Sequence, residues 1–213
     1  MLALPRRSFV TAAIALGLLG LFPAAGAQTR VDDTALARAL RAGGHIILMR
    51  HGATNPDQED ADPLNFDNIA GQRQLSDSGK ALAKAFGEAL RDAGVPIGKV
   101  YTSKYHRAYE TATLAGFTDV EKTPDLTYGG HFLRPGEDGR RTEALRAMLA
   151  TPPKPGTNTL MVTHKPNILH VLGDDWGDVK EGEALIFHPE NGKFVLVARV
   201  QMADWPRIAV ATH

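Results

Sequence analysis

Short segments of strand length alternate along this chain with segments whose apolar residues recur at helical spacing. The strands predicted before the C-terminal region are 45–49, 99–102 and 159–163. The predicted helices run from Asp32 or Asp33 to Leu40, from Ser76 or Asp77 to Gly94, and over 106–114, 140–150 and 167–172. Because continuous apolar runs suit strands that are buried on both faces, this alternation predicts a single α/β domain with a mostly parallel sheet.

Two further segments depart from that alternation. Residues 51–75 show no periodicity and are rich in Asp, Asn, Pro and Gly, which predicts a long loop of the kind that often carries function. Near the C-terminus, 184–187 and 194–200 flank the segment 189–192, which predicts a β-hairpin with an Asn-Gly turn. This hairpin either forms an edge of the sheet or pairs with another subunit, so the sequence leaves the oligomeric state open.

The first 27 residues have the pattern of a cleavable export signal. Arg6 and Arg7 precede the uncharged apolar run 9–22, and a small-x-small cleavage pattern follows at 25–27. The run is shorter than the roughly 20 residues that span a bilayer, so we expect no stable membrane anchor after cleavage. The paired arginines also resemble the twin-arginine export signal. We therefore expect one domain over 28–213, in the periplasm or secreted.

The composition narrows the classes of function. The chain has 24 basic and 24 acidic residues, and because residues 1–27 carry only basic charge, their removal leaves a slightly acidic protein. A balanced charge argues against a nucleic-acid binder. The chain contains 8 His and no Cys, which excludes a thiolate nucleophile, a disulfide framework and any Cys-ligated metal site. We expect neither a cofactor nor a metal.

Basic and imidazole side chains follow the predicted strands at the points where the strands end. Arg50 and His51 follow the first strand, Ser103 leads from the second towards Arg107, and His164 follows the third. Ligands of open parallel sheets bind at these carboxyl ends. Two Arg and two His there would form a cationic pocket that needs no metal.

Such a pocket suits phosphoryl transfer. The transition state spreads negative charge over three oxygens, and forked guanidinium donors grip phosphate oxygens in pairs. Imidazole is a good nucleophile near neutral pH, and a covalent phosphohistidine would divide hydrolysis into two easier displacements.

Four elements of the sequence resemble the histidine phosphatase superfamily, also called phosphoglycerate-mutase-like, and occur in the order of that family. They are Leu48-Met49-Arg50-His51-Gly52, the Leu-Ser-x-x-Gly of Gln74-Leu75-Ser76-Asp77-Ser78-Gly79, the Ser-x-x-x-Arg-Ala-x-x-Thr-Ala of 103–112, and Val162-Thr163-His164. An Arg-His-Gly triplet alone is a weak signal, whereas four ordered elements in matching strand, loop and helix contexts are a strong one. The resemblance implies a three-layer α/β/α fold.

The resemblance also implies roles for individual residues. His51 would be the nucleophile, Arg50 and Arg107 would bind phosphate, and His164 would be the second histidine of the phosphate pocket. Substrate contacts are expected from Thr54 and Ser103. The pocket mouth is expected to include Tyr128, His131, Phe132 and Arg134, with Arg134 favouring a second anionic group.

One part of the family pattern is missing. The family places a Glu that protonates the leaving oxygen where this chain has Tyr128, and a phenol is a poor acid for that task near neutral pH. Three explanations remain open. Asp125, Glu137 or Asp138 could supply the proton; the acidic stretch of Asp57, Glu59, Asp60 and Asp62 could fold over the pocket; or the leaving group could need no acid. For the acidic stretch we favour a solvated loop.

Two functions from different classes follow from these patterns. The first is an exported phosphatase that hydrolyses a small phosphomonoester, phosphoanhydride or phosphohistidine through a phosphohistidine at His51. The second is a non-catalytic phosphate- or phosphosugar-binding protein that lacks the general acid. In both cases the expected partner is a small phosphorylated molecule.

Overall fold

A computed structural model describes residues 32–129 and 134–211 of the chain. The predicted export signal over 1–27 lies outside the described residues, as do His131 and Phe132 of the predicted pocket mouth. Within the described part, none of the helices combines the length and the apolarity needed to cross a membrane.

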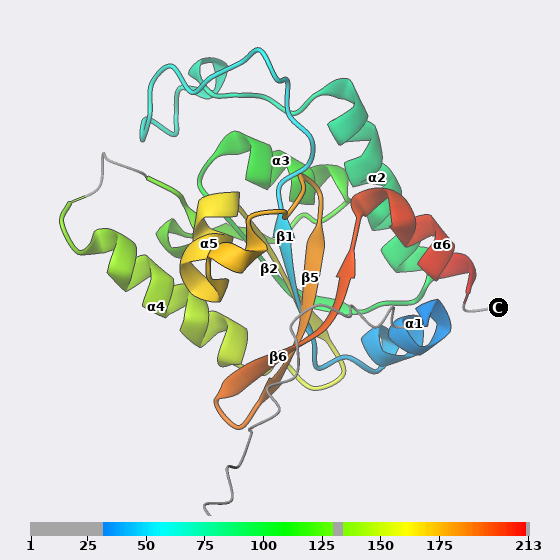
Figure 1. Cartoon of the computed structure of the whole chain (residues 1–213). Coiled ribbons are helices and arrows are strands. Elements are labelled where there is room, and N and C mark those ends of the chain that lie inside the picture. The colour runs from blue at the N-terminus through cyan, green and yellow to red at the C-terminus, as the bar shows by residue number, and fades with distance from the viewer. Residues whose placement is uncertain (1–31, 130–133, 212–213) are drawn as a thin grey trace, which may run out of the picture.

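Helices and strands alternate over most of the chain (Figure 1). The helices are α1 (Asp33–Ala42), α2 (Asp77–Asp92), α3 (His106–Leu114), α4 (Glu137–Ala150), α5 (Lys165–Leu172) and α6 (Trp205–Val210). The strands are β1 (Ile46–Arg50), β2 (Ile97–Thr102), β3 (Val120–Lys122), β4 (Asn158–Thr163), β5 (Ala184–Glu190) and β6 (Lys193–Val200). Capping residues begin the first two helices, because Asp32 accepts from the Thr34 amide and Ser76 from the Gly79 amide.

The six strands form one sheet in the order β3-β2-β4-β1-β5-β6. The four strands β3, β2, β4 and β1 are parallel, whereas β5 pairs antiparallel with both β1 and β6. The predicted hairpin is thus a continuation of the sheet, and β6 forms its edge. Asn191 and Gly192 at its turn both have positive φ angles, as a two-residue hairpin turn of this type requires.

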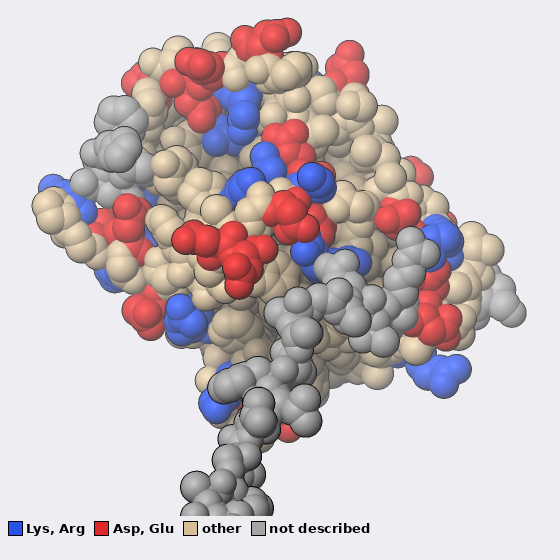
Figure 2. All heavy atoms as spheres, in the orientation of Figure 1, with Lys and Arg blue, Asp and Glu red and all other residues tan. Residues whose placement is uncertain are grey.

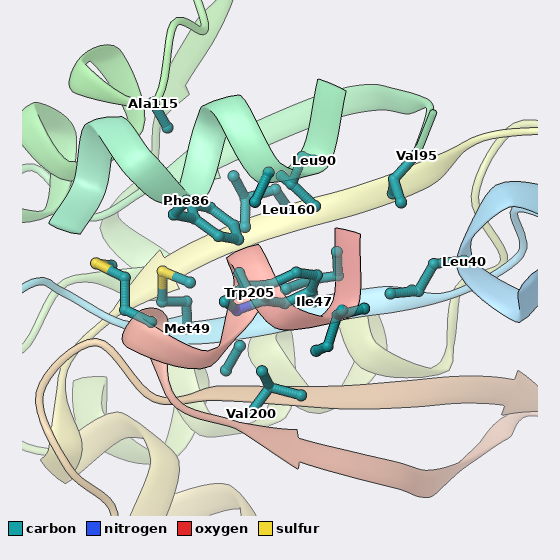
Figure 3. Packing of buried hydrophobic residues seen from close by; sticks show 14 of the residues in the cluster. Leu40, Ile47, Met49, Phe86, Leu90, Val95, Ala115, Leu160, Val200 and Trp205 are labelled. Atoms are coloured by element: carbon teal, nitrogen blue, oxygen red, sulfur yellow. The ribbon is translucent and has the colours of Figure 1, made fainter. Parts of the chain in front are cut away.

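Helices cover both faces of the sheet, which confirms the three-layer α/β/α fold (Figure 1). On one face, α1, α2, α3 and α6 enclose a core that includes Phe86 and Trp205. The two rings meet edge to face with their centroids 5.1 Å apart, above Ile47 of β1 (Figure 3). On the other face, α4 and α5 cover a second core that contains Ile46 and Leu48. Strand β1 is therefore buried on both sides, as its unbroken apolar run predicts.

Some of the observed elements differ from the predicted ones. Helix α4 begins at Glu137 rather than at Arg140, directly after Gly136, which has a left-handed conformation. Strand β3 has only three residues at a sheet edge, and α6 has only six, so neither is long enough to show a period.

Across the face shown in Figure 2, acidic and basic side chains are interleaved.

Candidate active site

The carboxyl ends of β2, β4 and β1 lie side by side and form the floor of a pocket of about 290 Å³. The residues that line the pocket are Arg50, His51, Gln58, Glu59, Asp60, Arg73, Arg107, Tyr128, His164, Lys165 and Pro166. The sheet order thus brings together the four residues that the sequence singled out at separate strand ends. The long loop after β1 supplies most of the remaining wall.

His51 is held rigidly at the end of β1. Its amide donates to the carbonyl of Thr163 at 3.0 Å, and its side chain is buried. Nδ1 lies 2.9 Å from the carbonyl oxygen of Gly52, which can only accept a hydrogen bond. Nδ1 therefore carries the proton, and Nε2 is left with an unshared electron pair. This is the tautomer that an imidazole nucleophile attacking through Nε2 requires.

The loop that follows His51 is fixed by contacts to two helices. The Gly52 amide donates to Thr111 Oγ1 at 3.0 Å, and that hydroxyl donates in turn to the carbonyl of Arg107. Helix α2 approaches so closely that a Cβ on Gly79 would lie 2.1 Å from the carbonyl oxygen of Ala53. The Gly of the Leu-Ser-x-x-Gly element is therefore required where the helix packs against the nucleophile loop.

Ser103 orients His164. His164 Nε2 lies 2.7 Å from Ser103 Oγ, and both side chains are buried. The proton of Thr127 Oγ1 is donated to the carbonyl of Thr123, so this oxygen accepts from Ser103 and from the amide of Lys104. Because Ser103 donates to Thr127, it accepts from His164, and His164 carries its proton on Nε2. The hydroxyl predicted to touch substrate is thus engaged with His164.

The two imidazole rings lie next to each other in the lining of the pocket. Their centroids are 5.2 Å apart and the rings are inclined by 58°. Burial, followed by the nearby Arg107, lowers the pKa of His51 well below its ordinary value of 6.5. Burial and Arg107 lower the pKa of His164 in the same direction. Both rings are therefore neutral near pH 7 until negative charge enters the pocket.

Three arginines surround the imidazole pair, namely Arg50, Arg73 and Arg107. In each of them the Nε–H group is buried and has no hydrogen-bond partner among the described residues. A buried donor without an acceptor is unfavourable by about 1–3 kcal/mol, more when the group is charged. The arrangement therefore favours an anion that accepts from several guanidinium groups at once.

Arg73 is absent from the sequence prediction. It is the only Lys or Arg between His51 and the start of α2, within a loop that is otherwise acidic and polar. That isolated positive charge was the signal that could have identified it. Its charge adds to those that lower the pKa of both pocket histidines.

The expectation of a solvated acidic loop is wrong for Asp60. Its carboxylate accepts from Arg107 Nη1 at 2.8 Å and from the amide of Arg73 at 2.9 Å. The loop is also held to the start of α3, because Gln72 Oε1 accepts from the amide of His106 at 2.7 Å. The uncompensated charge of a buried Arg107 draws this carboxylate inward, whereas Asp57 is exposed as predicted.

Arg50 and Thr54 share a carboxylate that the sequence did not indicate. Arg50 Nη2 donates to Glu181 Oε1 at 3.1 Å, and Nη1 donates to the carbonyl of Val179 at 3.0 Å. Thr54 Oγ1 donates to the same Glu181 oxygen at 2.8 Å. Thr54, predicted as a substrate contact, lies beside Arg50 but does not line the pocket. Its hydroxyl proton is engaged with Glu181.

The structure does not bring Asp125, Glu137 or Asp138 into the pocket, whereas Glu59 and Asp60 of the acidic stretch do line it. Asp125 pairs with Arg140 at 2.8 Å, and neither it nor Glu137 is among the pocket-lining residues. Hydrogen bonds from Arg140 and Arg141 lower the pKa of Glu137 to about 2, so its carboxyl group is ionised near neutral pH. Asp138 is exposed on the first turn of α4.

The remaining candidates are placed as follows. Tyr128 lines the pocket, as predicted, in the position where the family pattern has a Glu. Arg134 is exposed and is not among the lining residues. Over the described ranges, no cluster of three or more His, Asp or Glu side chains is arranged to hold a metal ion.

The fold and the pocket define an α/β protein with an anion site, built on two imidazoles and three guanidinium groups, at the carboxyl ends of its parallel strands. Residues 46–127 match the family model of the histidine phosphatase superfamily (branch 1). Over these residues the match confirms the resemblance drawn from the sequence. The match agrees with the predicted class, a histidine-type phosphatase.

Individual proteins agree with the family match. A curated relative is the mitochondrial serine/threonine-protein phosphatase Pgam5 of Drosophila virilis, which is 31% identical over 87 residues. The match spans 41% of this chain but only 27% of that protein. The solved structure of the protein histidine phosphatase SixA with tungstate superposes with a TM-score of 0.53 at 19% identity. It covers 75% of this chain and 98% of SixA.

A mycobacterial glucosyl-3-phosphoglycerate phosphatase, solved with VO3, also has a TM-score of 0.53, at 16% identity. It covers 73% of this chain and 98% of the mycobacterial protein. At these identities, the structural matches establish the fold.

Proposed function

We propose that this protein is an exported phosphatase that hydrolyses a small phosphorylated substrate through a phosphohistidine at His51. The observation that carries the proposal is the buried imidazole pair, 5.2 Å between centroids, in a pocket with three guanidinium groups whose Nε donors lack partners. The pattern of an export signal in residues 1–27 supports action in the periplasm or outside the cell.

The reaction has two displacements. In the first, His51 Nε2 attacks phosphorus as the bond to the leaving group breaks, and the leaving group takes a proton from solvent or from an acid. In the second, water attacks the phosphohistidine, releases inorganic phosphate and restores the neutral imidazole. The arginines stabilise the equatorial oxygens in both transition states. His164, whose Nε2 donates to Ser103, would take up a proton from solvent on Nδ1 when the anionic substrate enters, and Nδ1–H would then donate to the phosphoryl group.

The position of the general acid determines which leaving groups the enzyme can release. Asp125 and Glu137 pair with arginines outside the pocket, so neither stands where it would protonate a leaving alkoxide. Asp60 lines the pocket but is paired with Arg107, which leaves Glu59 as the lining carboxyl group that could supply the proton. An aryl oxide, a phosphate or an imidazole departs more readily without such help. Related structures come from phosphatases of a protein histidine and of a glucosyl phosphoglycerate, so they leave both kinds of substrate open.

The experiment incubates the mature protein with an activated aryl phosphate and, separately, with a sugar phosphate. The reactions are quenched in denaturant and assayed for acid-labile phosphate on His51. We expect a phosphoenzyme and turnover of the aryl phosphate, and loss of both in His51→Ala. Binding of phosphate without a phosphoenzyme or turnover would instead establish the alternative, a non-catalytic phosphate- or phosphosugar-binding protein.

A further inference from the structure

The segment that precedes β5 packs directly against the end of β1. The Gly182 amide donates to the carbonyl of His51 at 2.8 Å and lies 3.2 Å from that of Arg50. In return, the amide of Arg50 donates to the carbonyl of Glu183 at 3.0 Å. The backbone of Arg50 and His51 is therefore hydrogen-bonded to the segment 179–183, which lies far from it in the sequence.

Within this segment, the Glu181 carboxylate accepts three hydrogen bonds. Arg50 Nη2 and Thr54 Oγ1 both donate to Oε1, at 3.1 and 2.8 Å, and the Thr54 amide donates to Oε2 at 3.0 Å. Val179 accepts from the other terminal nitrogen of Arg50. Both ends of the Arg50 guanidinium are thus fixed by one segment, and its buried Nε–H is left without a partner among the described residues.

The segment is itself anchored to the edge of the sheet. Glu183 is buried, accepts from Arg199 of β6 and accepts from the Lys180 amide at 2.8 Å. Arg199 also donates to Asp178 at 3.1 Å. These contacts hold the residues on both sides of Glu181 in place, so the position of Glu181 is fixed independently of Arg50.

Glu181 differs from Asp60 in its position relative to the pocket. Asp60 lines the pocket, whereas Glu181 does not and approaches Arg50 from outside the lining. By charge alone, a carboxylate this close to an anion site weakens anion binding. Any benefit from Glu181 must therefore come from the geometry that it imposes on the guanidinium group.

From these contacts we infer that Glu181 is a positioning residue, which fixes the guanidinium of Arg50 and the Thr54 segment for the phosphoryl group. This inference rests on the proposed function. The inference predicts that removing the negative charge of Glu181 weakens the binding of an anion. Simple electrostatics predicts the opposite effect on the affinity.

The test measures tungstate binding by calorimetry and aryl phosphate turnover in Glu181→Gln and Glu181→Ala. All three groups that face Glu181 are donors, so an amide with a single acceptor oxygen cannot satisfy them. Because small misplacements of a positioning group are costly, we expect the tungstate Kd to rise and kcat/KM to fall, each on the order of tenfold. Glu143→Gln, on the exposed face of α4, is the matched charge control and should behave as the wild type.

A double-mutant cycle separates positioning from a general structural effect. If Glu181 acts through Arg50, then Arg50→Ala will cost less in the Glu181→Ala background than in the wild type. Additive losses, or a tungstate Kd in Glu181→Gln equal to or below that of the wild type, would overturn the inference. If the wild type neither binds tungstate nor turns over, the proposed function fails instead. Circular dichroism and the unfolding midpoint establish that each variant is folded.

Discussion

The hydrogen bond between Ser103 and His164 offers a sharp test of the site. Ser103→Ala removes the oxygen that lies 2.7 Å from His164 Nε2 and leaves that N–H group buried without an acceptor. The loss of a partner for a buried donor is worth about 1–3 kcal/mol. If that energy orients the ring for the transition state, kcat will fall by roughly 5- to 150-fold. The released ring also loses its defined tautomer.

The assay is the steady-state hydrolysis of an aryl phosphate at fixed pH, with tungstate binding measured in parallel. We expect kcat to fall more than the affinity for tungstate, because His164 is only one of the groups around the anion. Ser78→Ala is the matched control, since Ser78 is exposed and its hydroxyl contacts only Ser76 among the described residues. An unchanged kcat in Ser103→Ala would refute the proton assignment around His164.

Three further outcomes are expected. Asp60→Asn removes a carboxylate that competes with phosphate for Arg107, so the tungstate Kd should fall by roughly fivefold in calorimetry; a weaker complex would contradict this competition. Because nucleophilic attack needs a neutral imidazole and the pKa of His51 is lowered, kcat/KM should hold as the pH falls through 6.5 and decline only below it; a pH–rate profile with an acid limb at or above 6.5 would be inconsistent with the burial of His51. Trp205→Ala should lower the free energy of unfolding by about 3–5 kcal/mol in urea titrations, and a loss below about 1 kcal/mol would show that α6 is dispensable to the core.

The parts of the fold that the sequence predicts well are those with a strong local signal. The apolar run of β1, the Ser76 cap of α2 and the Asn191-Gly192 turn each determine local structure from neighbouring residues alone. Strand β3 and helix α6 lack such a signal because they are short and depend on packing. Helix α6, for example, is packed onto the core through the buried ring of Trp205, which meets Phe86 edge to face.

The site divides in the same way. His51 and His164 are recognisable because each directly follows a strand, within a motif. Arg73, Asp60 and Glu181 come from loops, and their positions are set by charge pairing across the fold rather than by periodicity. In the sequence, Asp60 is one of several acidic residues in a polar loop. Only the burial of Arg107 against that loop distinguishes it from the others.

The central place of β1 in the sheet also constrains how the chain folds. The His45 amide and its Asn158 acceptor are 113 residues apart, and Arg50 and Glu181 are 131 residues apart. Such long-range pairing is slow, because loop-closure entropy is lost before the contacts form. Strand β1 cannot pair until β4 and β5, which lie much later in the sequence, are available. The folding chain therefore passes through a period in which its most hydrophobic strand is exposed and prone to aggregation.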